Sequence, residues 1–159
     1  MIALGYIDPL RAIWWWSRVY KTLEDGDIPG HKRLRLTDGE FWSHPELPEW
    51  GTIRSLLTRA QRLSEVNGFH LVKAAIEVLE PNVVMPWHDN VIGEATVYVC
   101  LHCKHPRAVL YEDVAAAGLV SGHVWAVGNN AQKSALANFS GSVPAVSLVL
   151  ELRRERSED

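Results

Sequence analysis

No stretch of this sequence is both apolar enough and long enough to cross a membrane. The longest hydrophobic run near the N-terminus covers only residues 12–16, whereas a spanning helix needs about 20 apolar residues. Residues 1–10 also lack the ordered basic, apolar and small-residue segments of a secretory signal. We therefore expect a cytoplasmic protein without a membrane partner.

Cysteine is almost absent. Cys100 and Cys103 are the only two, and a bond between them along one extended strand would be strained, so reduced thiols are expected. Their Cys-x-x-Cys spacing lacks the second pair that a zinc site needs. Buried small residues of a sheet are therefore the preferred interpretation.

A surplus of charge of one sign is missing as well. The 16 Lys and Arg against 19 Asp and Glu leave a net charge of -3, which offers nothing for binding nucleic acid. What the sequence does have is 47% hydrophobic residues in a chain of 159, enough for the core of one domain. We predict a single domain over residues 1–152 and a charged tail over residues 153–159.

Two helices are predicted in the N-terminal half. Asp8 and Pro9 form a helix-start signal, and apolar residues follow at helical spacing as far as Leu23. Residues 52–67 carry apolar positions at i, i+3, i+4 and i+7, and Gly68 follows as a C-cap. Residues 26–50, with turn residues and scattered aromatics, are interpreted as an irregular connector.

After Gly68 the pattern changes to short β-rich runs. They cover residues 70–79, 95–103, 107–112, 123–127 and 143–152. Helices followed by strands with no helix between them favour an antiparallel sandwich or barrel with helices on one face. The expected class is mostly β, of the α+β type.

Residues 79–90 read Leu-Glu-Pro-Asn-Val-Val-Met-Pro-Trp-His-Asp-Asn, a strand leading through a turn to His88. This segment resembles the proximal iron-binding motif of the aspartyl/asparaginyl β-hydroxylase group of Fe(II)- and 2-oxoglutarate-dependent dioxygenases, in which a Leu-x-Pro-Gly turn precedes Pro-His. Asn82 takes the glycine position, and asparagine also enters the left-handed backbone region.

Residues 122–138 resemble the second half of the same family pattern. They supply a glycine, an apolar strand, Asn129 with Asn130, three further residues, the distal histidine position and then Asn138. Residues 45–62 resemble the helix that precedes the barrel in this family. The resemblance implies a double-stranded β-helix, which is a jelly-roll or cupin-like barrel, with two N-terminal helices. It also implies an oxidoreductase that hydroxylates a small molecule or amino-acyl substrate with Fe(II) and 2-oxoglutarate.

The sequence departs from this family at positions that carry its chemistry. The distal histidine position falls on Ser134, and Val143-Pro144-Ala145 stands where an arginine would clasp 2-oxoglutarate. The resemblance leaves His88 as the iron ligand, and a non-haem iron site needs two or three protein ligands on one face. A rebuilt metal site would combine His88 with Asp89, His102 or His123.

Two other functions stay open. One is a non-oxidative lyase, cyclase or isomerase without a cofactor, whose acid and base would come from Lys133, His88, Tyr98 or Asp89. The other is a non-catalytic domain whose cavity merely binds a small molecule. Contacts with a cofactor or ligand are expected from Ser134, Asn138, Trp125 and Asn130, and the simpler role of the loop residues is hydrogen bonding within the loop. The expected partners are a small molecule and, through the tryptophans at 14–16, a second copy of the chain.

Overall fold

The structure is a computed structural model that describes residues 1–7, 23–37, 50–66, 68–86, 88–89, 95–112, 115–128 and 133–154. The first predicted helix falls on residues 8–22, which lie outside this part of the chain, as does Asn130. Within the described ranges, no helix has the length and hydropathy of a membrane span.

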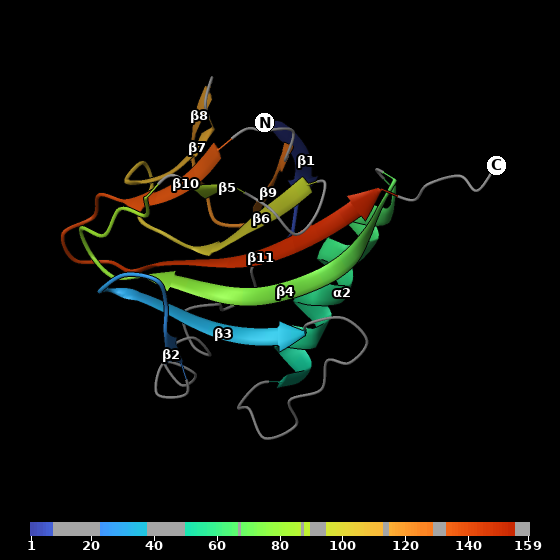
Figure 1. Ribbon diagram of the computed structural model, residues 1–159, viewed down its shortest axis with the longest axis horizontal. Coiled ribbons are helices and arrows are strands. Elements are labelled where there is room, and N and C mark those ends of the chain that lie inside the picture. The colour runs from blue at the N-terminus through green and yellow to red at the C-terminus, as the bar shows by residue number, and fades with distance from the viewer. Residues whose placement is uncertain are drawn as a thin grey trace.

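Two antiparallel sheets face each other (Figure 1). The larger sheet has the order β1 (Ile2–Tyr6), β9 (His123–Gly128), β6 (Ala95–His102), β11 (Ala145–Arg154), β4 (Phe69–Leu79), β3 (His31–Thr37) and β2 (Glu24–Asp25). The smaller sheet has the order β5 (His88–Asp89), β10 (Lys133–Asn138), β7 (Ala108–Glu112) and β8 (Ala115–Gly118). From β4 onwards the chain passes back and forth between the two sheets, which confirms the predicted jelly-roll barrel.

Helix α2 (Trp50–Val66) covers the outer face of the larger sheet (Figure 1). Its apolar stripe, which includes Leu56, Leu57 and Ala60, joins the cluster formed by the outward side chains of β4, β6 and β11. The helix ends as the sequence predicts, because Gly68 adopts a φ of 85° and its N–H donates to the Glu65 carbonyl at 2.9 Å.

Alternation along β11 divides the core into two layers. Leu148, Leu150 and Leu152 face α2, whereas Val149 and Glu151 face the interior of the barrel. Side chains on a strand point alternately to opposite faces, so each strand of the larger sheet contributes one row to the helix side and one row to the barrel side.

The five strands predicted after Gly68 are present as β4, β6, β7, β9 and β11. The interpretation of residues 26–50 as an irregular connector is wrong for residues 31–37, which form β3 and pair with β4. This strand alternates charged with apolar residues. Leu34 and Leu36 pack towards α2, whereas Arg33 faces into the barrel. The strand β11 also continues to Arg154, two residues beyond the end expected from the sequence.

Candidate functional site: a charged cavity inside the barrel

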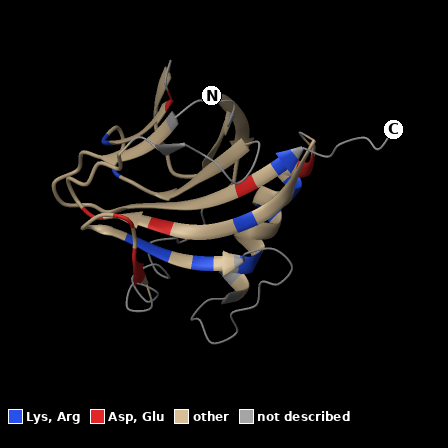
Figure 2. Cartoon of the chain, viewed as in Figure 1, with Lys and Arg blue, Asp and Glu red and all other residues tan. Residues whose placement is uncertain are grey.

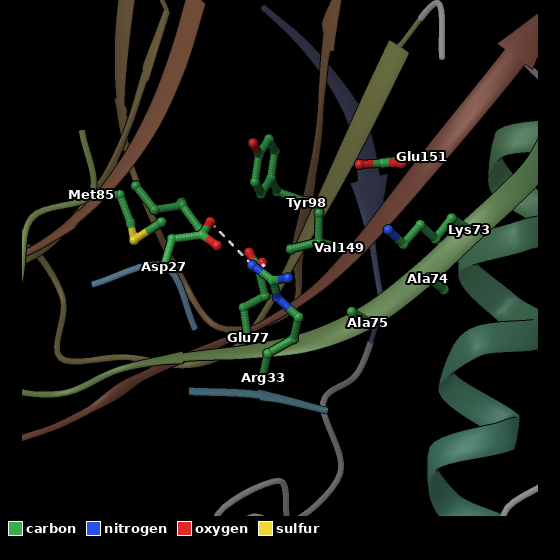
Figure 3. Close-up of a pocket in the computed structure, with 11 residues that line it drawn as sticks. Asp27, Arg33, Lys73, Ala74, Ala75, Glu77, Met85, Tyr98, Val149 and Glu151 are labelled. Atoms are coloured by element: carbon green, nitrogen blue, oxygen red, sulfur yellow. Dashed lines mark hydrogen bonds and ion pairs between the residues drawn. The ribbon is translucent and has the colours of Figure 1, made fainter. Parts of the chain in front are cut away.

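A cavity of about 150 Å³ lies between the two sheets (Figure 3). Strands β3, β4, β6, β10 and β11 contribute to its wall. Its apolar lining consists of Ala74, Ala75, Met85, Leu136 and Val149, and its polar lining of Asp27, Arg33, Lys73, Glu77, Tyr98 and Glu151. Figure 2 shows charged positions on β3, β4 and β11 of the larger sheet.

Strand periodicity explains why these charges share one cavity. Lys73 and Glu77 lie four residues apart on β4 and therefore point to the same face. Glu151 lies directly opposite Lys73 in the pairing of β11 with β4. None of these three residues is among the site residues predicted from the sequence. A signal was nonetheless present, because each interrupts an otherwise apolar strand at a position that faces the barrel.

Tyr98 and Ser134 connect the two sheets inside the barrel. Their hydroxyl oxygens are 3.3 Å apart, and the residues are 2% and 0% exposed. Burial raises the pKa of Tyr98 above its ordinary value, the charges of Glu77 and Glu151 raise it further, and the hydrogen bond with Ser134 acts in the opposite direction. The Tyr98 hydroxyl is therefore protonated at neutral pH and can serve as a hydrogen-bond donor.

Replacing Tyr98 by phenylalanine is expected to make the free energy of unfolding fall less steeply with pH at alkaline pH. Above the ordinary tyrosine pKa of 10.0 the unfolded chain loses this proton, whereas the folded chain keeps it. The free energy of unfolding of the wild type therefore falls, by about 1.4 kcal/mol for each pH unit until the folded-state pKa is reached. Urea unfolding of both proteins between pH 9 and 11 measures the difference. Parallel pH profiles would contradict a raised pKa.

A chain of polar contacts holds the opposite side of the cavity. Arg33 Nη2 donates to Asp27 Oδ2 at 3.1 Å, and Arg33 Nε lies 3.6 Å from Glu77 Oε1. The buried His31 accepts the Asp27 backbone N–H at Nδ1, 3.1 Å away. The ring proton is therefore assigned to Nε2, which lies 3.4 Å from Glu77 Oε1. The positive charge of Arg33 is thus already matched by carboxylates of the protein.

The pairing of β5 with β10 places two predicted site residues opposite each other. His88 is the register partner of Ser134, and Asp89 is the partner of Lys133. The sequence spacing assigned Ser134 to the second histidine position, and the register puts that position directly across from His88. The described part of His88, Asp89 and Lys133 is the backbone, which fixes their strand positions.

The two other candidate histidines lie elsewhere. His102 is opposite Val146 at the end of β6, four residues beyond Tyr98 and hence about 13 Å along the strand. Burial lowers the pKa of His102. The ring of His123 packs edge-on against Tyr6 with a centroid distance of 5.9 Å. The structure therefore does not bring His102 next to the Tyr98–Ser134 pair.

Trp125 and Asn138, both predicted to contact a ligand, have different surroundings. Trp125 is the strand neighbour of Tyr98, and its buried indole Nε1 has no hydrogen-bond partner among the described residues. Asn138 is buried, and its side chain bonds backbone groups of Leu79, Val143 and other residues at the end of the barrel. Asn138 therefore makes local hydrogen bonds of the kind expected as its simpler role, from the end of β10 and not from a loop.

The thiols lie in or next to β6, as expected from the sequence. Both cysteines are free, and Cys100 is buried within the strand. Cys103 Sγ donates to the Leu119 carbonyl at 3.3 Å. The hydrogen bond between the thiols raises the pKa of Cys100 and lowers the pKa of Cys103.

Comparison with protein-family models and with curated protein sequences finds no match. Among solved structures, a prolyl-4-hydroxylase from Pseudomonas putida aligns with 93% of this chain and 86% of its own, at a TM-score of 0.63 and 14% identity. An oxidoreductase of the 2OG-Fe(II) oxygenase family from Burkholderia pseudomallei aligns with 85% of this chain and 73% of its own, at a TM-score of 0.59 and 17% identity.

This chain has the fold of these oxygenases. Salicylate 1,2-dioxygenase from Pseudoaminobacter salicylatoxidans aligns with 87% of this chain and 29% of its own, at a TM-score of 0.50 and 10% identity. The likeness confirms the fold that the sequence motifs predicted. Membership of the aspartyl/asparaginyl hydroxylase group stays a prediction.

The described side chains do not fit the iron centre that the sequence resemblance implies. Ser134 occupies the position opposite His88, and its hydroxyl contacts Tyr98. Glu112, the neighbour of Ser134 on β7, is ion-paired with the Met1 ammonium at 2.7 Å. Among the described residues, no cluster of three His, Cys, Asp or Glu side chains is placed to hold a metal. The donor set therefore differs from the two histidines and one carboxylate of non-haem iron oxygenases.

The position of the expected 2-oxoglutarate arginine is also occupied differently. Ala145 begins β11 there, and the space beside it is lined by Leu79, Leu119, Leu136, Ala137, Glu77 and Ser147. Neither a lysine nor an arginine is among these residues. A dicarboxylate bound at this place would lack the guanidinium that normally compensates its charge.

Proposed function

We propose that this protein binds a small organic molecule in the barrel cavity, with the oxygenase-type fold acting as a recognition site that is not built around Fe(II) and 2-oxoglutarate. One observation carries this proposal. The Tyr98–Ser134 hydroxyl pair stands inside the barrel, and Ser134 holds the register position opposite His88. A pair of hydroxyls suits hydrogen bonding to a ligand better than it suits binding ferrous iron.

The size and lining of the cavity support a compact ligand. A volume of about 150 Å³ is comparable to that of cavities known to hold a molecule such as benzene. Its described lining combines five apolar side chains with six polar ones, so it offers a ligand both apolar contact and directed polar groups. Leu136 and Met85 provide apolar contact, and the protonated Tyr98 hydroxyl provides a directed donor.

Iron-dependent hydroxylation is the second candidate, because His88 pairs with β10 in a barrel that resembles a prolyl-4-hydroxylase. We expect purified protein freed of metal by a chelator to be stabilised thermally by members of a small-molecule library. Supplied with Fe(II), 2-oxoglutarate and oxygen, the same protein is expected to form no succinate.

Two variants separate the candidates. His88→Ala removes the one histidine that the resemblance assigns to iron, and His70→Ala removes an exposed histidine of β4 as a control. Stoichiometric iron together with succinate formation that His88→Ala abolishes and His70→Ala retains would establish the oxygenase instead. Failure of every library compound to raise the melting temperature would remove the binding proposal.

A further inference from the structure

We infer that the cavity selects a compact zwitterion, a molecule with one ammonium and one carboxylate group, and disfavours dianions such as 2-oxoglutarate. This inference rests on the proposed function, because it names the ligand class for the same cavity. It is carried by the Lys73 ammonium and a Glu151 carboxylate oxygen, which have no partner among the described residues, lie on neighbouring strands and line the same cavity.

Lys73 and Glu151 are register partners on β4 and β11. Opposed side chains on antiparallel strands have Cβ atoms about 5 Å apart, close enough to act on one ligand. Figure 3 shows both side chains at the same side of the cavity, with no interaction drawn between them. A ligand with a carboxylate for Lys73 and an ammonium for Glu151 matches this arrangement.

Neither group has its charge met by the protein. Within the described part of the chain Lys73 makes no hydrogen bond or ion pair, and Glu151 Oε2 is buried without a hydrogen-bond partner. A buried carboxylate oxygen without a partner is costly, and a ligand ammonium would supply the missing donor. By contrast, Arg33 is engaged by Asp27 at 3.1 Å and faces Glu77, so of the described cations that line the cavity Lys73 is the one left for a ligand.

The sum of the charges excludes a dianion on electrostatic grounds. Among the described residues, three carboxylates and two cations line the cavity, so their formal charges sum to one negative. A ligand with two negative charges would enter a site that is already negative and whose walls are partly buried, so the repulsion is screened less than in bulk water. A zwitterion adds no net charge and can place its ends on opposite partners.

The test measures binding by isothermal titration calorimetry with matched probes. The zwitterions are β-alanine and γ-aminobutyrate. Propionate and butyrate lack the ammonium, propylamine and butylamine lack the carboxylate, and 2-oxoglutarate is the dianion. At least one zwitterion is expected to bind about tenfold or more tightly than its two one-charge analogues and than 2-oxoglutarate, because each charge-assisted contact contributes a factor of about ten or more.

Variants then assign the contacts. Lys73→Gln and Glu151→Gln are each expected to weaken the binding of the preferred zwitterion about tenfold or more. Lys73→Gln is also expected to weaken the binding of the carboxylate analogue, and Glu151→Gln the binding of the amine analogue. Lys104→Gln and Glu24→Gln, at exposed positions outside the cavity, are the matched controls and are expected to bind like the wild type.

The outcomes distinguish the inference from the proposal on which it rests. If a neutral molecule or 2-oxoglutarate binds in preference to the zwitterions, the ligand class is wrong and the binding function stands. If no small molecule of any class binds, both are wrong. If Lys73→Gln or Glu151→Gln does not fold, the comparison of zwitterions with their one-charge analogues on the wild type still decides the ligand class.

Discussion

Replacing Asn138 by alanine is expected to lower the free energy of unfolding by about 3–5 kcal/mol. The residue is 1% exposed, and its Nδ2 atom donates to the carbonyls of Leu79, Glu80 and Val143 at 3.0–3.2 Å. Its Oδ1 atom accepts the Ser140 N–H at 3.1 Å. Alanine leaves these groups without that partner, and each buried group left unpaired costs about 1–3 kcal/mol. Urea unfolding followed by far-UV circular dichroism measures the loss.

Two further variants show that the loss comes from the backbone contacts. Asn138→Asp keeps an acceptor for Ser140 but turns a carboxylate towards the carbonyls, so it is expected to destabilise nearly as much. Gln61→Ala removes an amide from the surface of α2, where it contacts Glu65, and is expected to cost less than about 0.5 kcal/mol. An Asn138→Ala protein that keeps its stability but loses ligand affinity would instead support the ligand contact predicted from the sequence.

One strand pairing agrees with the spacing of the two sequence motifs, whereas the roles of the paired residues stay predictions. The two motifs lie about forty residues apart in the sequence, yet counting from Asn130 to Ser134 located the residue that pairs with His88. The count succeeds because strand register is rigid. A shift by one residue would turn every side chain of β10 to the other face and would remove Leu136 from the core.

The charged face of the cavity could not be predicted in the same way. A charge in a strand usually marks the solvent side, and the turn residues and aromatics around β3 favour an irregular connector. In this barrel the second face of the larger sheet also points inward, and Arg33 finds Asp27 there. That partner precedes β3 by a turn, so the pairing follows from the path of the chain and not from the periodicity of the strand.

Strand β10 was missed because its composition is weak for a strand. It consists of Lys-Ser-Ala-Leu-Ala-Asn, and alanine and asparagine are depleted in strands. Pairing with β7 on one side and with β5 on the other stabilises the extended conformation of β10, and Ser134 has a register partner on each of these strands. Tertiary context thus overrides the local preference at the residue on which the proposed function depends.

The fold and the chemistry of this chain are therefore separable. The fold resembles that of solved oxygenases, but the proposed site depends on a few side chains, among them Ser134 and Lys73. In this chain the packing lies mostly on the α2 side of the larger sheet, away from the cavity. A barrel packed in this way can keep its fold while the side chains of its cavity change, and one fold can therefore support many functions. Variants on the α2 side should change stability without changing the ligand.

Leu57→Ala on α2 is expected to reduce the free energy of unfolding by about 3 kcal/mol while leaving the affinity of the cavity unchanged. Leu57 is 0% exposed and belongs to the cluster that includes Leu148 and Leu150 of β11. Truncating a buried leucine removes transfer free energy and leaves a void, at a cost of about 2–5 kcal/mol. The measurement pairs urea unfolding with calorimetric titration of the preferred ligand.

Val66→Ala provides the comparison, because Val66 lies on the same helix but is 84% exposed, and its truncation is expected to cost less than about 0.5 kcal/mol. A Leu57→Ala protein as stable as Val66→Ala would mean that α2 is not docked on the sheet. A loss of affinity in folded Leu57→Ala would mean that the two layers of the core are coupled, since β11 carries Leu150 on one face and Glu151 on the other. Unchanged affinity at reduced stability is the result that the alternation of β11 requires.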